Sequence, residues 1–182
     1  MKRFIVAAVA VIMLLSVPAF AQTYDTGDQE MGIEFNFSDN DNDGRDTTGA
    51  AEGFWLYYAT PKVAIGGIAS AIYNEDMAGQ GLGAYWEYNF DKMTMGNFFI
   101  GVDGQYLAGD FDQVAAMSSA ARIGYKMHIG DTAKVRFSAS YTALFDTNEG
   151  DSPLIDDTIN DAESLALKIG VSFKFGNETA VN

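Results

Sequence analysis

The sequence predicts an all-β protein, an eight-stranded antiparallel up-and-down transmembrane β-barrel. Three observations support this fold: a secretory leader, a strict alternation of apolar and polar side chains in segment after segment, and the concentration of acidic residues in every second connector between these segments. The last segment, residues 164–175, reads S-L-A-L-K-I-G-V-S-F-K-F. Its period of two is typical of a strand with one apolar and one polar face.

The leader occupies residues 1–21. Lys2 and Arg3 precede an apolar run over residues 4–17, and the small-x-small pattern that signal peptidase accepts ends at Ala21. A retained anchor is less favoured, because the run is shorter than the roughly 20 apolar residues of a spanning helix. We expect a cleaved signal peptide, followed by a single barrel domain over residues 22–182.

Composition excludes several classes of site. The chain has no cysteine, so disulfides, thiolate metal sites and a lipid anchor on a cysteine are all excluded. Without Lys2 and Arg3, 9 of the 11 basic residues remain against 25 acidic ones, which gives a formal charge of −16. A nucleic acid partner is excluded, because binding phosphates requires a basic surface.

Eight segments show the length and alternation of barrel strands. They are residues 30–37, 53–60, 62–73, 81–90, 97–107, 119–129, 134–145 and 164–175. The first, third, fifth and seventh connectors are longer than those between them, as in outer-membrane barrels with short periplasmic turns and longer outer loops. We therefore expect an integral protein of the bacterial outer membrane with both termini in the periplasm.

Acidic residues follow the same division. The four longer connectors contain one base, Arg45, and a large set of acids. These acids are Asp39, Asp41, Asp43, Asp46, Glu52, Glu75, Asp76, Asp110, Asp112, Asp146, Glu149, Asp151, Asp156, Asp157, Asp161 and Glu163. Charge and connector length thus indicate the same topology.

The free-energy cost of exposing a charged side chain to lipid decides which face of each strand points outward. An Arg or Lys facing lipid near the midplane costs about 2 to 4 kcal/mol, so the polar set is expected to face the lumen and the apolar set the lipid. The predicted lumen charge network is Glu34, Glu87, Asp103, Arg122, Lys126, Arg136 and Lys168. Residues 53–60 are apolar on both faces and residues 62–73 show no clean face, so neither segment is oriented by its pattern.

At this level the chain resembles the small eight-stranded outer-membrane barrels of the OmpX type and the transmembrane domain of OmpA. The resemblance rests on the leader, the strand number, the alternation and the loop asymmetry. It implies insertion by the barrel-assembly machinery, which reads a last strand that ends in an aromatic residue, here Phe175. We expect a monomeric or weakly associating barrel in contact with outer-membrane lipid and lipopolysaccharide. Residues 176–182 follow this aromatic residue, where such chains often stop.

One connector contains a partial calcium motif. Asp39, Asp41, Asp43 and Gly44 match positions 1, 3, 5 and 6 of a calcium loop, in which alternate carboxylates converge on the ion. Position 12 is Ala50 rather than Glu, and strands rather than helices flank the loop. The pattern favours a solvated acidic loop over a Ca²⁺ site, and no other cofactor is indicated.

These observations predict a non-enzymatic protein with a structural or surface-interaction role through its acidic loops. The single histidine, His128, falls near the periplasmic end of a strand, away from the outer rim where barrel enzymes place their catalytic groups. Two alternatives remain open: a narrow porin-like passage for small solutes, and a soluble periplasmic barrel of the lipocalin kind that binds an apolar ligand. Alternation alone fits both a membrane barrel and a soluble one.

Overall fold

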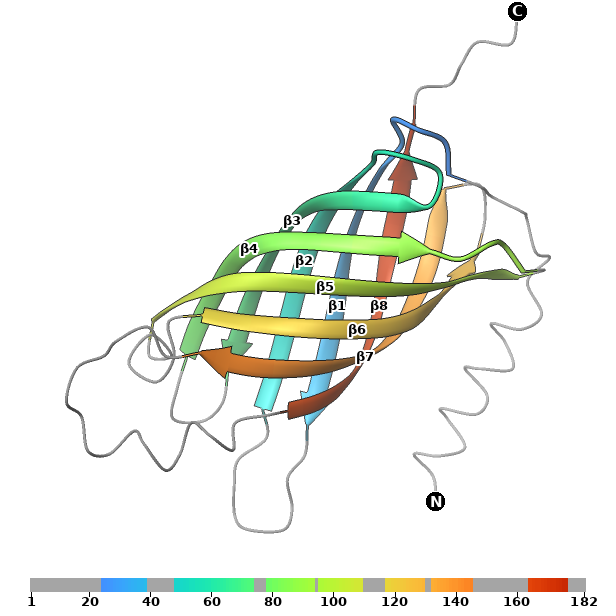
Figure 1. Ribbon diagram of the computed structural model, residues 1–182. Helices are drawn as coiled ribbons and strands as arrows, with labels where there is room; N and C mark the ends of the chain where they lie inside the picture. The colour runs from blue at the N-terminus through green and yellow to red at the C-terminus, as the bar shows by residue number, and fades with distance from the viewer. Residues whose placement is uncertain are drawn as a thin grey trace, which may run out of the picture.

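The structure is a closed antiparallel barrel (Figure 1). The computed structural model describes residues 24–38, 48–73, 78–93, 95–109, 117–129, 132–145 and 164–176. Within them lie β1 (Gln29–Ser38), β2 (Thr48–Tyr58), β3 (Val63–Tyr73), β4 (Ala78–Asn89), β5 (Gly96–Gly109), β6 (Met117–His128), β7 (Ala133–Phe145) and β8 (Ser164–Phe175). No described segment forms a helix long and apolar enough to cross a membrane. The predicted leader lies outside the described residues.

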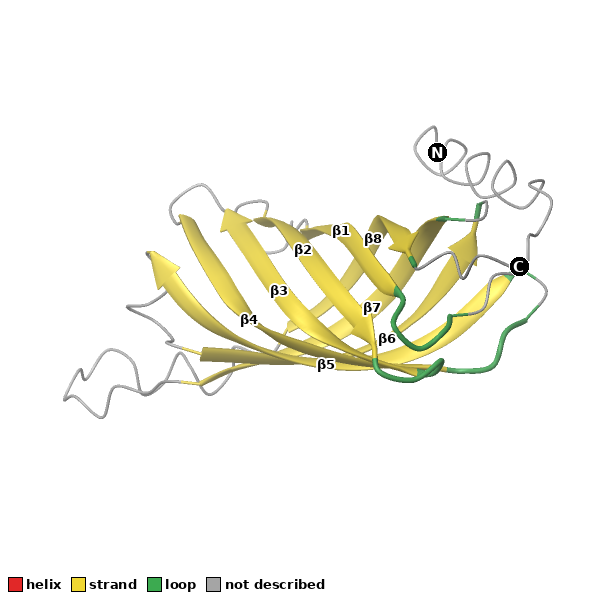
Figure 2. Ribbon diagram, turned by 90° about the horizontal axis from the view of Figure 1, so that it is seen from above, coloured by secondary structure: helices red, strands yellow, loops and turns green. Residues whose placement is uncertain are grey.

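Each strand pairs with its neighbour in the chain, and the ring closes where β8 pairs with β1. The closing register joins Gln29 to Phe175 and Asn36 to Lys168. Closure leaves no unpaired strand edge, which removes the usual route to edge-to-edge aggregation. The strands run obliquely around a common lumen, as the two views show (Figures 1 and 2).

The two ends of the barrel differ. The turn end carries connectors 59–62, 90–95 and 129–132 and the start of β1, whereas the loop end carries connectors 39–47, 74–77, 110–116 and 146–163. The strands extend further toward the loop end than the sequence predicts. The loop 74–77 is consequently only as long as the turn 59–62, so three loops rather than four are longer than the turns.

The sequence-based assignment of Glu52 to a loop is wrong. The ladder between β1 and β2 continues to the pair Ser38 and Thr48, so β2 begins five residues before the predicted start at residue 53. Glu52 is a strand residue opposite Glu34, and its side chain is buried. Backbone pairing, which the local sequence does not report, extends the strand through this polar stretch.

The apolar set lies on the outer face of the barrel and the ionic residues on the inner face, as the alternation predicts. Leu82, Leu165 and Leu167 on the outer face are 71%, 76% and 75% exposed. The structure also orients the two ambiguous strands: Trp55 and Tyr57 of β2 point outward, as does Ile65 of β3. The inner face of these strands carries Phe54, Leu56, Tyr58, Ala64 and Ile68, all buried. Met127 and Val135 share the outward parity but are themselves buried.

The soluble lipocalin-like alternative requires the opposite arrangement. In such a barrel the apolar set lines the interior and the ionic set meets water. Here Arg136 and Lys168 are buried, whereas Leu167 and Ile169 are exposed on the outer surface. A protein with an apolar outer surface and ionic lumen is suited to lipid rather than to water.

Substitution of an outward residue by arginine tests this arrangement. Ile169 lies on the outer face at mid-strand and is half exposed, whereas Tyr73 ends β3 at the loop end. We expect Ile169→Arg to lower the free energy of unfolding in phospholipid bilayers by about 2–4 kcal/mol, and Tyr73→Arg by about 0–1 kcal/mol. The measurement is urea unfolding of the refolded barrels. Equal losses at the two positions would contradict a lipid-exposed belt.

Candidate functional site in the barrel lumen

The inner face of the barrel holds five buried acids and five buried bases. The acids are Glu30, Glu34, Glu52, Glu87 and Asp103, and the bases are Arg122, Lys126, Lys134, Arg136 and Lys168. All seven residues of the predicted lumen charge network are among them, and the structure brings them together in one chain of ion pairs. Their charges balance, so the lumen carries no formal excess.

Arg136 is the centre of the half nearer the turn end. Its guanidinium donates from Nε to Glu34 at 2.7 Å, from Nη1 to Glu30 at 2.9 Å and from Nη2 to Glu87 at 2.8 Å. The same guanidinium lies 4.4 Å from the ring centroids of Phe54 and of Phe99. Every face of this cation is therefore occupied, by carboxylates in its plane and by aromatic rings.

Lys126 completes this half. Its ammonium bridges Glu30, at 3.0 Å, and Glu87, with which it forms a close ion pair. Tyr58 donates its hydroxyl proton to Glu30 at 2.7 Å. Each buried carboxylate thus has several donors, which is the condition under which a buried charge is tolerated.

A second group fills the half nearer the loop end. Arg122 donates to Asp103 and to Glu52, both at 2.6 Å, and Lys168 contacts the other oxygen of Glu52 at 2.7 Å. Glu34 joins the halves, because Arg122 Nη1 lies 3.4 Å from its second carboxylate oxygen. The ion pairs therefore extend through most of the height of the barrel.

Tyr24 covers the lumen at the turn end. It precedes β1, and its ring stacks on Tyr58 with centroids 3.8 Å apart. Its hydroxyl donates to Glu30 at 2.5 Å, and the ammonium of Lys134 lies 4.3 Å from its ring centroid. Burial, together with the negative charges of Glu30 and Glu87, raises the pKa of Tyr24 well above its usual range. The phenol stays protonated and keeps donating.

Sequence reasoning missed Tyr24, Glu30, Glu52 and Lys134. Two of them carried a usable signal: Glu30 has the parity of Glu34 along β1, and Lys134 has the parity of Arg136 along β7. Tyr24 lies outside every strand pattern, so no periodic signal could have placed it. Its position depends on the chain folding back over the barrel end.

The described residues offer no assembled catalytic or metal centre. No three His, Asp or Glu side chains among them are arranged to hold a metal ion. His128 is buried at the turn end, with Nε2 3.3 Å from Asn97 Oδ1. The predicted calcium ligands Asp39, Asp41 and Asp43 lie outside the described residues. The chemistry visible in the lumen is ion pairing and packing.

Comparison with known proteins gives one family and several similar structures. The family model described as outer membrane protein beta-barrel domain matches residues 7–182. Neisserial surface protein A is similar with a TM-score of 0.57 and 14% identity, covering 81% of this chain and 96% of its own. The N-terminal barrel of Pseudomonas aeruginosa OprF (TM-score 0.51, 11% identity) covers 85% of this chain and 100% of its own.

Pseudomonas aeruginosa OprG (TM-score 0.52, 10% identity) covers 86% of this chain and 100% of its own. At these identities the likeness shows the fold alone. The curated proteins contain no match to the chain.

Removing one lumen cation should be far more costly than removing one surface cation. Arg136→Met leaves the carboxylates of Glu30, Glu34 and Glu87 short of a partner inside the barrel, and we expect a loss of about 3–5 kcal/mol in the free energy of unfolding. Lys62→Met, which breaks the exposed pair with Asp91, should cause no measurable loss. Denaturant unfolding in bilayers compares the two variants. Similar losses would show that the lumen pairs contribute no more than surface pairs.

Proposed function

This chain belongs to the family of outer membrane protein β-barrel domains, and within it we propose a non-enzymatic protein whose barrel is a scaffold for acidic loops at the cell surface. The loops then contact ligands outside the cell or support the integrity of the envelope. The observation that carries the proposal is the separation of charge. The lumen network is neutral, whereas the loop-end connectors are strongly acidic.

The loop-end connectors keep their acidic character without Glu52. They contain Asp39, Asp41, Asp43, Asp46, Glu75, Asp76, Asp110, Asp112, Asp146, Glu149, Asp151, Asp156, Asp157, Asp161 and Glu163, against Arg45. Such a surface repels anionic partners and attracts cationic ones. We propose that a partner, if it is a protein, presents a basic surface.

The proposed sidedness rests on the difference in length between the connectors at the two ends. We propose that the loop end faces the exterior and that both termini lie in the periplasm, because outer-membrane barrels have short periplasmic turns and longer outer loops. We also propose that the leader is removed after Ala21 and that the barrel-assembly machinery inserts the chain by recognising β8. The inserted protein is then a monomer in contact with outer-membrane lipid and lipopolysaccharide.

A narrow passage for small solutes is the alternative role. An eight-stranded barrel leaves an interior just wide enough for side chains to fill. Here Arg136 reaches from β7 to carboxylates on β1 and β4, and Tyr24 covers the turn end. These groups would have to separate before a solute could pass, so the packing supports the scaffold role.

Cysteine labelling tests the sidedness. The chain has no cysteine of its own, so a single introduced thiol reports without background. We expect Gly150→Cys, in the loop 146–163, to react with a membrane-impermeant maleimide on intact cells. Lys92→Cys, in the turn 90–95, should react only after the outer membrane is permeabilised. The reverse pattern would place the acidic loops in the periplasm and overturn the proposal.

Conductance tests the scaffold role against the passage. We expect the refolded wild-type barrel to show no steady open conductance in planar bilayers, because the ion pairs and aromatic rings fill its cross-section. A porin of about sixteen strands in the same bilayer serves as the positive control. A steady open level from the wild-type barrel would favour the passage.

A further inference from the structure

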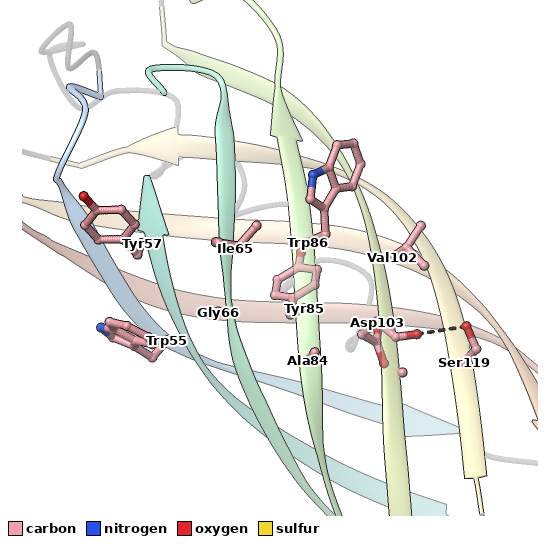
Figure 3. A pocket seen from close by; sticks show the side chains of 11 residues that line it. Trp55, Tyr57, Ile65, Gly66, Ala84, Tyr85, Trp86, Val102, Asp103 and Ser119 are labelled. Atoms are coloured by element: carbon pink, nitrogen blue, oxygen red, sulfur yellow. Dashed lines mark hydrogen bonds between the residues drawn. The ribbon is translucent and has the colours of Figure 1, made fainter. Parts of the chain in front are cut away.

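A groove of about 850 Å³ crosses the outer face of the barrel over β2 to β6 (Figure 3). Its lining is mainly apolar and aromatic: Trp55, Tyr57, Ile65, Gly66, Ala84, Tyr85, Trp86, Val102, Asp103, Gly104 and Ser119. Tyr85 and Asp103 are buried, and the carboxylate of Asp103 is paired with Arg122 inside the lumen. Trp55, Trp86 and Val102 are exposed residues of the outer face, so the groove lies on the lipid-facing surface.

The floor of the groove follows a row of small residues: Ala84, Gly104 and Ser119 line the groove, and Gly67 continues their row on β3 beside the lining residue Gly66. The strand register pairs Gly67 with Ala84, Ala84 with Gly104, and Gly104 with Ser119. Trp55 pairs with Gly67 and closes the row on β2. At the other extreme Ser119 lies near the loop end of β6, with its hydroxyl turned back to the Asp103 carbonyl at 2.9 Å. These residues form the floor of a slot that Trp55 closes at one end and that is open toward the loop end.

Large residues flank the floor, and those nearer the turn end line the groove. On the side nearer the turn end, Tyr57, Ile65, Trp86 and Val102 are linked in register, and they form the upper row in Figure 3. On the loop side, Leu82 pairs with Tyr106 and both are well exposed. Residues on one face of a strand repeat at about 7 Å, so a single row of small residues leaves a slot about one side chain wide.

The backbone does not require glycine at positions 67 and 104 of the floor. A Cβ on Gly67 would meet nothing closer than the Gly83 carbonyl oxygen at 3.8 Å, and one on Gly104 nothing closer than the Ser118 oxygen at 4.0 Å. Neither has a positive φ. Gly83 differs, because a Cβ there would collide with the Gly104 backbone. The small size at Gly67 and Gly104 thus serves no packing inside the barrel and leaves open space only on the lipid side.

We propose that this groove binds the acyl chain of a membrane lipid that enters from the leaflet at the loop end. From β3 to β6 the floor spans about 15 Å along its path, three strand spacings, and its tilt makes this a rise of about 10 Å, a third of the roughly 30 Å hydrocarbon core. Because barrel strands tilt by about 35–45°, a row perpendicular to them rises at about 45–55° to the axis and leads from mid-membrane toward the loop end. A flexible chain can follow this path.

An acyl chain fits the groove better than a second copy of the barrel. Two convex cylinders meet along a line of protruding side chains, whereas a specific protein interface buries about 1,200–2,000 Å². A recessed slot one side chain wide reduces that contact further. This inference goes beyond the proposed surface role, since it needs only residence in a membrane and no particular activity of the loops.

The two tryptophans of the chain both line the groove, which makes it directly observable. In a Trp55→Phe background, Trp86 is the single reporter. The barrel is refolded in phosphatidylcholine vesicles whose lipids carry brominated acyl chains, which quench tryptophan on contact. It is then transferred to bromine-free mild detergent, which dilutes loosely associated lipid away. We expect at least half of the Trp86 quenching to persist in detergent.

Two matched variants decide the outcome. Gly104→Leu fills the floor and should reduce the persistent quenching at least fivefold. Gly53→Leu adds the same side chain to an open outward position on β2, outside the floor, and should leave the quenching unchanged. Both variants must first show the heat-modifiable gel mobility of a folded barrel.

The proposal fails if quenching disappears from the parent barrel in detergent, or persists equally in Gly104→Leu. It also fails if native mass spectrometry of the parent shows a dimer in place of a monomer carrying lipid. A negative result here leaves the cysteine-labelling and conductance outcomes untouched, so failure of the groove and failure of the surface role are distinguishable.

Discussion

The cost of exposing an ionised side chain to hydrocarbon is the constraint on which the structure depends. Each outward Arg or Lys at the midplane would cost about 2–4 kcal/mol, a large part of a stability that is typically about 5–15 kcal/mol. The barrel therefore gathers ten charges in its lumen and pairs them. Arg136 connects β7 to carboxylates on β1 and β4, across the lumen rather than along the sheet. Backbone hydrogen bonds close the cylinder, and these ion pairs brace its interior.

The same constraint shapes the surfaces of this protein. A lumen filled by ion pairs, by Phe99 and by the Tyr24 ring leaves little room for a solute. The role we propose therefore uses the surfaces that remain, which are the loop-end connectors and the outer wall. These surfaces differ in chemistry, because the connectors are acidic and the wall is apolar. The groove floored by Gly67, Ala84 and Gly104 is a local feature of that wall, suited to lipid and not to a polar ligand.

Much of the fold could be predicted because alternation is a local property. Along β8 the polarity of each side chain indicates whether it faces the lumen or the lipid, and the same holds for β1 and for β4 to β7. Alternation does not orient or delimit every strand. β2 is apolar on both faces because Leu56 and Tyr58 pack inside while Trp55 and Tyr57 face outward, so polarity could not distinguish the two. Glu52 falls in a loop by sequence because it lies among the small residues Ala50, Ala51 and Gly53, although backbone pairing with β1 continues past it.

The sequence by itself determined the strand period, the inward parity of the ionic residues and the acidic character of the connectors, since each depends on neighbours a few positions away. The tertiary structure alone decided which charges meet. Arg136 and Glu30 are 106 residues apart, and their contact depends on closure of the ring and on the stagger of its strands. The groove has the same origin, because Gly67, Ala84, Gly104 and Ser119 become neighbours only through the register of four strands. Register is a property of the whole cylinder, and no local pattern contains it.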